Sequence, residues 1–182
     1  MAWDVEGTKR KILDAATREF VAHGQHGTTI ERIARRAGVN KERVYHYYGG
    51  MTDLFATVLR EKVAEGAGAV LLPATGVDQV AEFEARLFDF NNEHSDLIRL
   101  LMWEALAFTD EVPDEGKRVA MYRRRTDELR AGQQSGVISD TLDADMLHLL
   151  LLSLVGYGAL LPQVVRMITG DHRAAARAMG ER

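Results

Sequence analysis

The sequence contains no cysteine, which excludes disulfides and thiolate metal sites and is typical of a protein of the reducing cytoplasm. Only three of its 182 residues are proline, and 46% are hydrophobic, which is enough for one large or two small domains with a real core. The first seven residues, MAWDVEG, lack a basic region followed by an apolar stretch. We therefore expect a cytoplasmic protein without a signal peptide.

Catalytic motifs are missing as well. The chain has no phosphate-binding glycine loop, no His-Glu-x-x-His zinc motif and no Gly-x-Ser-x-Gly nucleophile motif, and its six histidines lack the spacing of metal ligands. His94, Ser95 and Asp96 are adjacent, and because chain neighbours point to different sides they do not form a catalytic triad. These absences predict a protein that is not an enzyme and uses neither a metal nor another cofactor.

The charge that is present is unevenly distributed. Residues 1–62 contain 11 Lys or Arg against 8 Asp or Glu, whereas residues 63–182 contain 12 against 19, so the balances are +3 and −7. A basic head on an acidic body suits a protein whose first third faces an anion such as the phosphate backbone of DNA.

Helical periodicity runs through nearly the whole chain, and no strand pattern of useful length interrupts it. The first helix, with Ile12, Leu13, Ala16 and Phe20 on its inner face, is expected at 8–23 and ends at Gly24. Further helices are predicted between Thr29 and Gly38, at 41–47, from about 51 to Pro73, and at 77–92, 96–108, 115–134, 143–168 and 171–179. The fold class is therefore all-α.

Residues 29–48 have the pattern of two short helices joined by a tight turn. Thr28, Thr29 and Glu31 match a capping box at the start of the first, Gly38 allows the turn, and Asn40 can cap the second. Such hairpins are common in proteins, so the spacing alone is equally compatible with a solvated helical pair.

The outer face of the second short helix favours a partner. With Val44 and Tyr48 inward, this helix presents charged and aromatic side chains outward, namely Lys41, Glu42, Arg43, Tyr45, His46 and Tyr47. Exposed rings have little reason to be there unless a partner covers them. A helix of this kind can enter the major groove of DNA, which is about 12 Å wide.

The stretch TTIERIARRAGVNKERVYHYY, residues 28–48, resembles the DNA-binding signature of the TetR (tetracycline-repressor-like) family, and Ile12 to Gly24 resembles the first helix of that family. The resemblance covers roughly residues 8–62. It implies an N-terminal three-helix helix-turn-helix domain that binds double-stranded operator DNA, followed by a C-terminal helical domain that binds a small-molecule effector and forms a homodimer. The corresponding boundaries are 1–50 for the DNA-binding domain, 51–72 for a connecting helix and 73–182 for the effector and dimer domain.

Carried onto matching positions, the resemblance implies that Thr29 contacts phosphate and that Lys41 and Arg43 reach base edges or phosphates. Tyr45 would pack on a thymine methyl or a phosphate, and His46 and Tyr47 would hydrogen-bond the DNA backbone. Arg43 is the preferred specificity residue because arginine pairs bidentately with guanine.

Two positions depart from the family pattern. Met51 stands where a phosphate-binding lysine is usual, so Lys9, Arg10 or Lys11 would have to replace that contact. Glu42 stands where a small residue is commoner. It either accepts from a cytosine amine or caps the helix, and the capping role is favoured.

Residues 146–165 contain no Asp, Glu, Lys or Arg, a length that can in principle cross a bilayer. The polar residues inside it and the acidic Asp143 and Asp145 before it argue against a membrane span. A helix that is apolar all round is instead expected between its own domain and a second subunit, and the core of a monomer is the remaining alternative. The predicted dimer contacts are Leu147, Leu151, Leu154, Gly158, Leu161 and Val165.

Aromatic and sulphur-containing side chains recur on the central helices, where they are more often ordinary core than ligand contacts. As a group they suggest a cavity for a flat apolar molecule. The candidate effector residues are Phe88, Asn91, Met102, Trp103, Glu104, Phe108, Met121, Tyr122, His148 and Tyr157.

These observations predict a dimeric repressor that a small, largely apolar or aromatic effector releases from an inverted-repeat operator. Two other interpretations remain open. The chain can be an activator or a regulator without effector, or a helical small-molecule binding or sequestering protein whose hairpin is vestigial.

Overall fold

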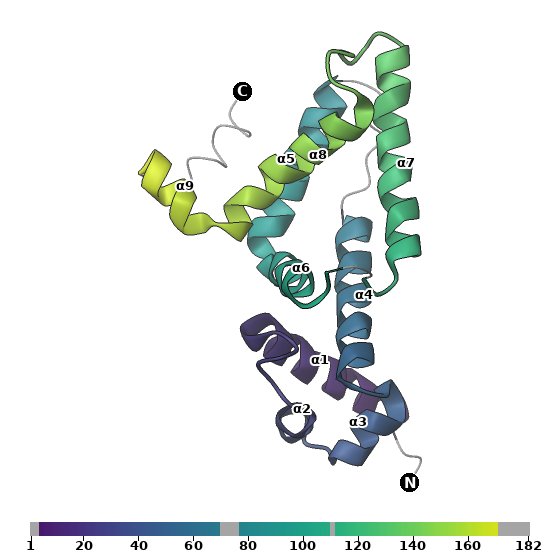
Figure 1. Cartoon of the computed structure of the whole chain (residues 1–182), viewed down its shortest axis with the longest axis vertical. Helices are drawn as coiled ribbons and strands as arrows, with labels where there is room; N and C mark the ends of the chain where they lie inside the picture. Colours follow the sequence, from purple (N-terminus) through teal and green to yellow (C-terminus); the bar gives the residue numbers. More distant parts are fainter. Residues whose placement is uncertain (1–3, 70–76, 110–111, 171–182) are drawn as a thin grey trace. The chain divides into compact units, whose positions relative to one another are not determined.

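The computed structural model describes residues 4–69, 77–109 and 112–170, and all regular structure in these ranges is α-helical (Figure 1). The helices are α1 (Val5–His23), α2 (Ile30–Ala37), α3 (Lys41–Tyr48), α4 (Met51–Ala69), α5 (Val77–Glu93), α6 (Ser95–Ala107), α7 (Glu115–Gln134), α8 (Ala144–Leu160) and α9 (Pro162–Thr169). The all-α prediction is confirmed. The predicted helix at 171–179 and the end of the predicted fourth helix, residues 70–73, lie outside the described residues.

The chain divides into two compact units. Unit 1 combines residues 1–65 with 99–114, and unit 2 combines 66–98 with 115–182. Both units are therefore assembled from two separate stretches of chain, and α4 and α6 each contribute residues to both. The linear domain boundaries expected at 50 and 72 stay a prediction.

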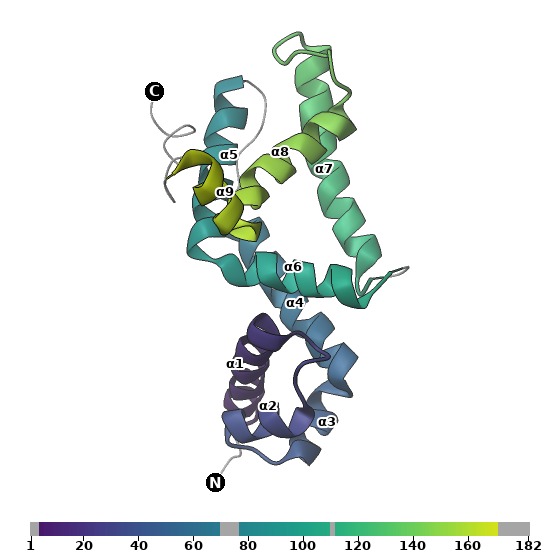
Figure 2. The same cartoon turned by 60° about the vertical axis from the view of Figure 1, so that its left-hand side comes forward.

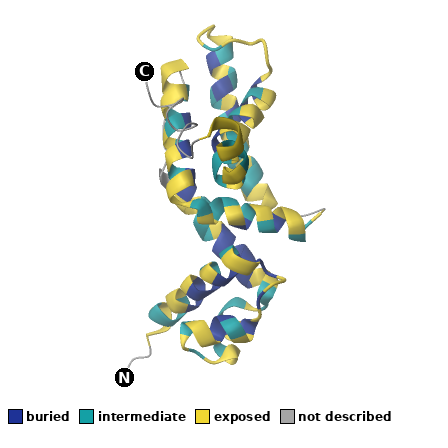
Figure 3. Ribbon diagram, turned by 90° about the vertical axis from the view of Figure 1, so that its left-hand side faces the viewer, coloured by how far each residue is buried: buried dark blue, intermediate teal, exposed yellow. Residues whose placement is uncertain are grey.

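The core of unit 1 is built on the buried face of α1, which packs against α2 and reaches α4. Ile12, Ala16 and Phe20 are fully buried, and the ring of Phe20 meets the ring of Phe55 edge-on with centroids 5.2 Å apart. These positions repeat at helical spacing, so one face of α1 is apolar and the other is solvated. The buried residues appear dark blue in Figure 3. The inner face predicted for the first helix is confirmed.

The turn between α2 and α3 has the predicted geometry. Gly38 adopts a left-handed conformation with φ 69° and ψ 32°, which a residue without a Cβ enters at little cost. Asn40 then caps α3, because its side-chain oxygen accepts a hydrogen bond from the amide of Arg43 at 3.1 Å. Both predictions, the glycine turn and the Asn40 cap, are confirmed.

The start of α2 differs from the expected capping box. Thr29 is the N-cap and accepts from the amide of Arg32 at 3.2 Å. The Thr28 hydroxyl instead donates to the buried carboxylate of Glu19 at 2.9 Å. This places Glu31 one position too early to close a box with Thr29, and Glu31 pairs with Lys41. The reciprocal capping box was therefore wrong, and a single threonine cap replaces it.

In unit 2, α8 packs against both α5 and α7; it crosses in front of α5 in Figure 1 and lies between the two helices in Figure 2. Buried Leu129 of α7 and Ala144 of α8 form the centre of one cluster. Four partly buried side chains pack against it, namely Val80, Ile138, Leu147 and Leu151. One face of α8 is thus committed to the interior of its own unit.

The single helix predicted at 143–168 is wrong, because two helices, α8 and α9, meet there at an angle of 91°. The break falls at Leu161 and Pro162. Proline has no amide hydrogen and disfavours helical geometry in the residue before it, and Leu161 accordingly has φ −131° and ψ 59°. Within the described residues, no single helix is long and apolar enough to span a bilayer; only this bent pair, taken together, reaches the required length and composition.

Candidate DNA-binding surface and effector site

The third helix exposes most of the residues predicted to touch DNA. Lys41, Glu42, Tyr45 and His46 are exposed, and Tyr45 retains 51% of its accessible surface. Val44 on the opposite side of the helix is only 1% exposed and attaches α3 to the rest of unit 1. The helix therefore has one buried attachment point and a free polar and aromatic face, as expected from the sequence.

The inner edge of α3 is held by its tyrosines. The hydroxyl of Tyr48 donates to the backbone carbonyl of Lys9 at 3.1 Å. Burial, helped by the carboxylates of Glu61 and Glu6, raises the pKa of Tyr48 to about 12, so its hydroxyl keeps the proton that it donates. The ring of Tyr47 is half-buried, and the ammonium of Lys9 lies 5.9 Å from its centre. These contacts fix α3 to the first turns of α1.

The cationic residues near α3 differ in how they are engaged. Lys41 lies 3.7 Å from Glu31, and both side chains are more than half exposed, so a phosphate can replace this surface pair at little cost. Arg43 is half-buried, and its contact with guanine stays a prediction. Of the substitutes proposed for the lysine missing at Met51, Arg10 pairs with Asp14 and Glu61, whereas Lys11 is exposed.

A buried carboxylate that the sequence analysis overlooked braces the helix-turn-helix. Glu19 of α1 is 2% exposed and accepts from Thr28 at 2.9 Å and from the guanidinium of Arg36 at 2.7 Å, with Arg32 at 3.0 Å. Burial alone would raise the pKa of Glu19, but these hydrogen bonds and the two positive charges hold it below its ordinary value.

The consequence is that α1 and α2 are joined by a charged clamp in addition to apolar packing. Arg35, which also lines the surface cleft beside Glu19, stays exposed on the same helix. A glutamate on the apolar side of α1, three residues after the buried Ala16, was the signal that could have revealed the clamp.

The predicted effector residues are divided between the two units. Met102, Trp103, Glu104 and Phe108 belong to unit 1. The indole nitrogen of Trp103 donates to the carbonyl of Val21 at 3.3 Å, and its ring lies against Gly24, while Phe108 faces Phe55 with centroids 6.4 Å apart. Trp103 and Phe108 therefore contact other residues of unit 1, and the effector role expected for these four residues stays a prediction.

The remaining predicted effector residues lie in unit 2. Phe88 and Asn91 are buried on α5, and His148 is buried on α8. Asn91 reaches the carbonyl of Val155 at 3.5 Å, at the limit of a hydrogen bond. Met121 and Tyr122 of α7 are half-buried, whereas Tyr157 is 42% exposed on α8. Unit 2 thus keeps a smaller group of buried polar and aromatic residues than the sequence predicted.

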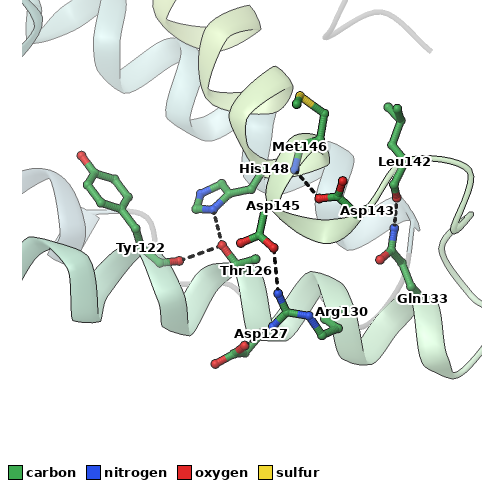
Figure 4. A network of polar contacts seen from close by, with 10 residues as sticks. All are labelled: Tyr122, Thr126, Asp127, Arg130, Gln133, Leu142, Asp143, Asp145, Met146 and His148. Atoms are coloured by element: carbon green, nitrogen blue, oxygen red, sulfur yellow. Dashed lines mark hydrogen bonds and ion pairs between the residues drawn. The ribbon is translucent and has the colours of Figure 1, made fainter.

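His148 is held by a hydroxyl of the neighbouring helix. Its Nδ1 lies 2.9 Å from the Thr126 hydroxyl, which also bonds the carbonyl of Tyr122 at 3.2 Å (Figure 4). Burial, together with the positive charge of Arg125, lowers the pKa of His148, so the neutral ring is favoured. The same figure shows Arg130 of α7 reaching Asp145 of α8, which adds a surface link between these helices.

Glu84 of α5 is a second buried acid that the sequence analysis missed. It is 8% exposed, and its Oε2 atom has no hydrogen-bond partner within the described part of the chain. Burial raises the pKa of Glu84 to about 7, although the positive charge of Arg125 acts against this rise. The signal was visible as an acid at the core-facing spacing between Val80 and Phe88.

The residues predicted for the dimer interface fall on two sides of α8. Leu147 and Leu151 pack into the core of unit 2, and Gly158 lies against the ring of Phe88. Leu154 is 58% exposed, whereas Leu161 and Val165 are half-buried. The exposed stripe of α8 runs instead along Met146, Leu149, Leu150, Leu154, Tyr157 and Leu160. The apolar face available to a partner is therefore rotated from the predicted one.

Two family models match the chain. Residues 12–58 match the model described as bacterial regulatory proteins, tetR family, and residues 79–181 match the model described as tetracyclin repressor-like, C-terminal domain. The chain is 38% identical over 170 residues to the HTH-type transcriptional repressor SCO4008 of Streptomyces coelicolor, covering 93% of this chain and 87% of that protein. It is 26% identical over 149 residues to the HTH-type transcriptional repressor NicS of Pseudomonas putida, covering 79% and 65%.

Solved structures share the fold. The putative transcriptional regulator SCO4942 from Streptomyces coelicolor superposes with a TM-score of 0.80 at 26% identity, over 94% of this chain and 93% of that one. The regulator FadR from Bacillus subtilis, solved with stearoyl-CoA, gives 0.72 at 18% identity, over 94% and 95%. The second likeness concerns the fold alone.

Proposed function

The chain belongs to the TetR family of bacterial regulatory proteins, and on that premise we propose that it is a homodimeric repressor that a small effector releases from an inverted-repeat operator. Members of this family are transcriptional regulators, and this chain acts in the cytoplasm as a regulator and not as an enzyme. The observation that carries the proposal is the free face of α3, where Lys41, Tyr45 and His46 are exposed around the buried anchor Val44.

The third helix reads the operator from the major groove. Lys41 exchanges its weak surface pair with Glu31 for a DNA phosphate, and Arg43 recognises guanine through two parallel hydrogen bonds. Tyr45, His46 and Tyr47 contact thymine methyls or the backbone, and Thr29 contacts phosphate at the start of α2. Glu42 interacts with the free amides at the start of α3.

A second copy of the chain covers the exposed stripe of α8. Leu149, Leu150 and Leu154 each expose about half of their surface or more, and Met167 and Ile168 of α9 are still more exposed. No charged side chain interrupts residues 146–165, so the face suits an apolar partner of the same kind. A twofold dimer would place two α3 helices about 34–36 Å apart, in successive major grooves.

Release follows from a difference in affinity. The effector binds more tightly to a conformation in which the two α3 helices are wrongly spaced, so its binding shifts the population away from the DNA-bound form. Buried Phe88, Asn91 and His148 of unit 2 belong to the effector site.

Selection of bound sequences from random duplex DNA tests the proposal. The full chain is expected to enrich an inverted repeat whose half-sites are about 10 base pairs apart, or a multiple of that spacing. Arg43→Ala should abolish discrimination at one base position in each half-site, whereas Arg123→Ala, which changes an exposed arginine of α7, should leave the enriched sequence unchanged. No enrichment by the unaltered chain at low salt would contradict the proposal.

Sedimentation tests the dimer separately. Leu150→Glu places a charge in the middle of the stripe and should shift the chain to monomer, with operator affinity reduced. Val77→Glu is a matched control because Val77, 58% exposed against 49% for Leu150, is a similarly exposed apolar residue that lies on α5. A Leu150→Glu variant that remains dimeric would remove α8 from the interface.

A further inference from the structure

Glu84 occupies a position where the pattern of α5 calls for an apolar residue. The inward face of this helix is formed by Val80, Phe88 and Asn91, and Glu84 lies between them at one-turn spacing. Acidic residues are almost never fully buried unless they are paired, since a carboxylate loses its hydration in the interior. Its location therefore needs an explanation beyond packing.

The protein supplies no hydrogen bond to the buried Oε2 atom of Glu84 in the described part of the chain. The cation that acts on it is Arg125, whose guanidinium carbon lies 3.4 Å from the centre of the Phe83 ring. That guanidinium also donates to Glu128 at 2.7 Å. Arg125 is thus engaged elsewhere, and its positive charge acts on Glu84 through space.

Glu84 and His148 share this neighbour. The positive charge of Arg125 opposes the rise that burial causes in the pKa of Glu84 and adds to the lowering of the pKa of His148, so all three groups lie within electrostatic range in unit 2. His148 has a hydrogen-bond partner at Nδ1, the hydroxyl of Thr126, whereas the Oε2 atom of Glu84 has none in the described part of the chain. Aromatic side chains belong to the same group: Phe88 is buried one turn further along α5, and the ring of Tyr122 lies 6.3 Å from the ring of His148.

A buried carboxylate without a partner destabilises the chain that contains it, and such groups concentrate at ligand sites. The ligand that offsets this cost is one with a positive charge. We propose that Glu84 is the charge-recognising residue of the effector site and that the effector is an organic cation with an apolar, aromatic body. This inference rests on the proposed function, since it specifies the chemistry of the effector.

The cation binds the ionised form of Glu84, so its affinity should rise as the pH increases through the raised pKa of this residue, about 7. The other charged or titratable groups packed around it are Arg125 and Glu128 on α7 and His148 and Asp145 on α8. Protonation of His148 at low pH would weaken cation binding in the same direction. A variant of Glu84 is therefore needed to separate the two contributions.

Titration calorimetry of the full chain with two matched probes tests the inference. N-methylacridinium carries a permanent charge, and acridine is its neutral counterpart at pH 8. The unaltered chain should bind the cation at least about tenfold more tightly than acridine, a difference of about 1.4 kcal/mol, and should bind it about tenfold more tightly at pH 8 than at pH 6. Glu84→Gln should lose the preference for charge and most of the pH dependence.

Glu82→Gln is the matched control, because it removes a carboxylate of the same helix that is exposed and paired with Arg86. It should behave as the unaltered chain. Equal affinity for the two probes, no binding of N-methylacridinium, or a preference that survives in Glu84→Gln would each overturn the inference.

Retention of operator DNA in the absence of any probe distinguishes a failure of the role proposed for Glu84 from a failure of the proposed function. Retention of operator DNA by the unaltered chain, combined with no charge preference, would refute only the role of Glu84. Failure of the unaltered chain to retain any DNA would refute the proposed function itself.

Discussion

Replacing Glu84 by glutamine should stabilise the protein, and the gain should depend on pH. The pKa of the carboxyl rises from 4.5 to about 7 on folding, which corresponds to a free-energy difference of about 3 kcal/mol. The folded chain therefore binds this proton more tightly than the unfolded chain does. The cost of ionising Glu84 is absent below pH 4.5, grows between the two pKa values and is fully present above pH 7.

Urea unfolding followed by circular dichroism at pH 5, 6, 7 and 8 measures this cost. The unfolding free energy of Glu84→Gln minus that of the unaltered chain should increase with pH, by up to about 3 kcal/mol over the whole window. His148, whose lowered pKa makes stability fall as the pH decreases, is present in both proteins and largely cancels in the difference. Glu82→Gln should give a flat difference.

A difference that stays constant or decreases as the pH rises would refute the reasoning. It would mean that the carboxyl of Glu84 is ionised and paired in the folded protein. Arg125 is the residue that could then provide the charge, in place of its contacts with Phe83 and Glu128.

Three further outcomes follow from unit 1 and its proposed contact with DNA. Glu19→Gln should lower the unfolding free energy by about 2 kcal/mol at pH 7. This loss is smaller than that expected for a fully buried ion pair, because the arginine partners are partly exposed. It should shrink when the pH falls below the ordinary pKa of a glutamate, because the folded-state pKa of Glu19 is lowered. Gly24→Ala should lower the unfolding free energy by about 3 kcal/mol, because Gly24 has φ +65° and a Cβ there would meet the Trp103 ring at 2.7 Å. Gly38→Ala should lower it by only about 1 kcal/mol, because a Cβ there meets open space. Thermal unfolding measures both. The logarithm of operator affinity should fall linearly with the logarithm of the salt concentration, and Lys41→Ala should reduce the slope by about two per dimer, measured by fluorescence anisotropy.

The helix-turn-helix was predictable from the sequence because its determinants are local. The left-handed Gly38, the Asn40 cap and the inward Val44 each depend on residues within a turn or two of themselves. The capping box failed for the opposite reason. Thr28 is claimed by Glu19, nine residues earlier, and helical periodicity does not reveal which polar groups meet in space.

The body was predicted less completely. Periodicity identified the helices but treated 143–168 as continuous, although Pro162 removes the amide that a continuous helix needs. It also identified Trp103 and Phe108 as inward-facing without indicating which unit they face. Leu147 and Leu151 were assigned to a partner, yet they serve the core of their own unit, because an apolar helix surface does not indicate which side is covered within the chain.

Protection of guanine N7 atoms on the selected operator tests the central claim most directly, because this atom lies in the major groove. The account predicts that the full chain protects guanines in two half-sites about one helical turn apart, and that Arg43→Ala loses protection at one guanine in each half-site while Arg123→Ala keeps it. Operator binding without any N7 protection, or protection that Arg43→Ala leaves intact, would contradict it.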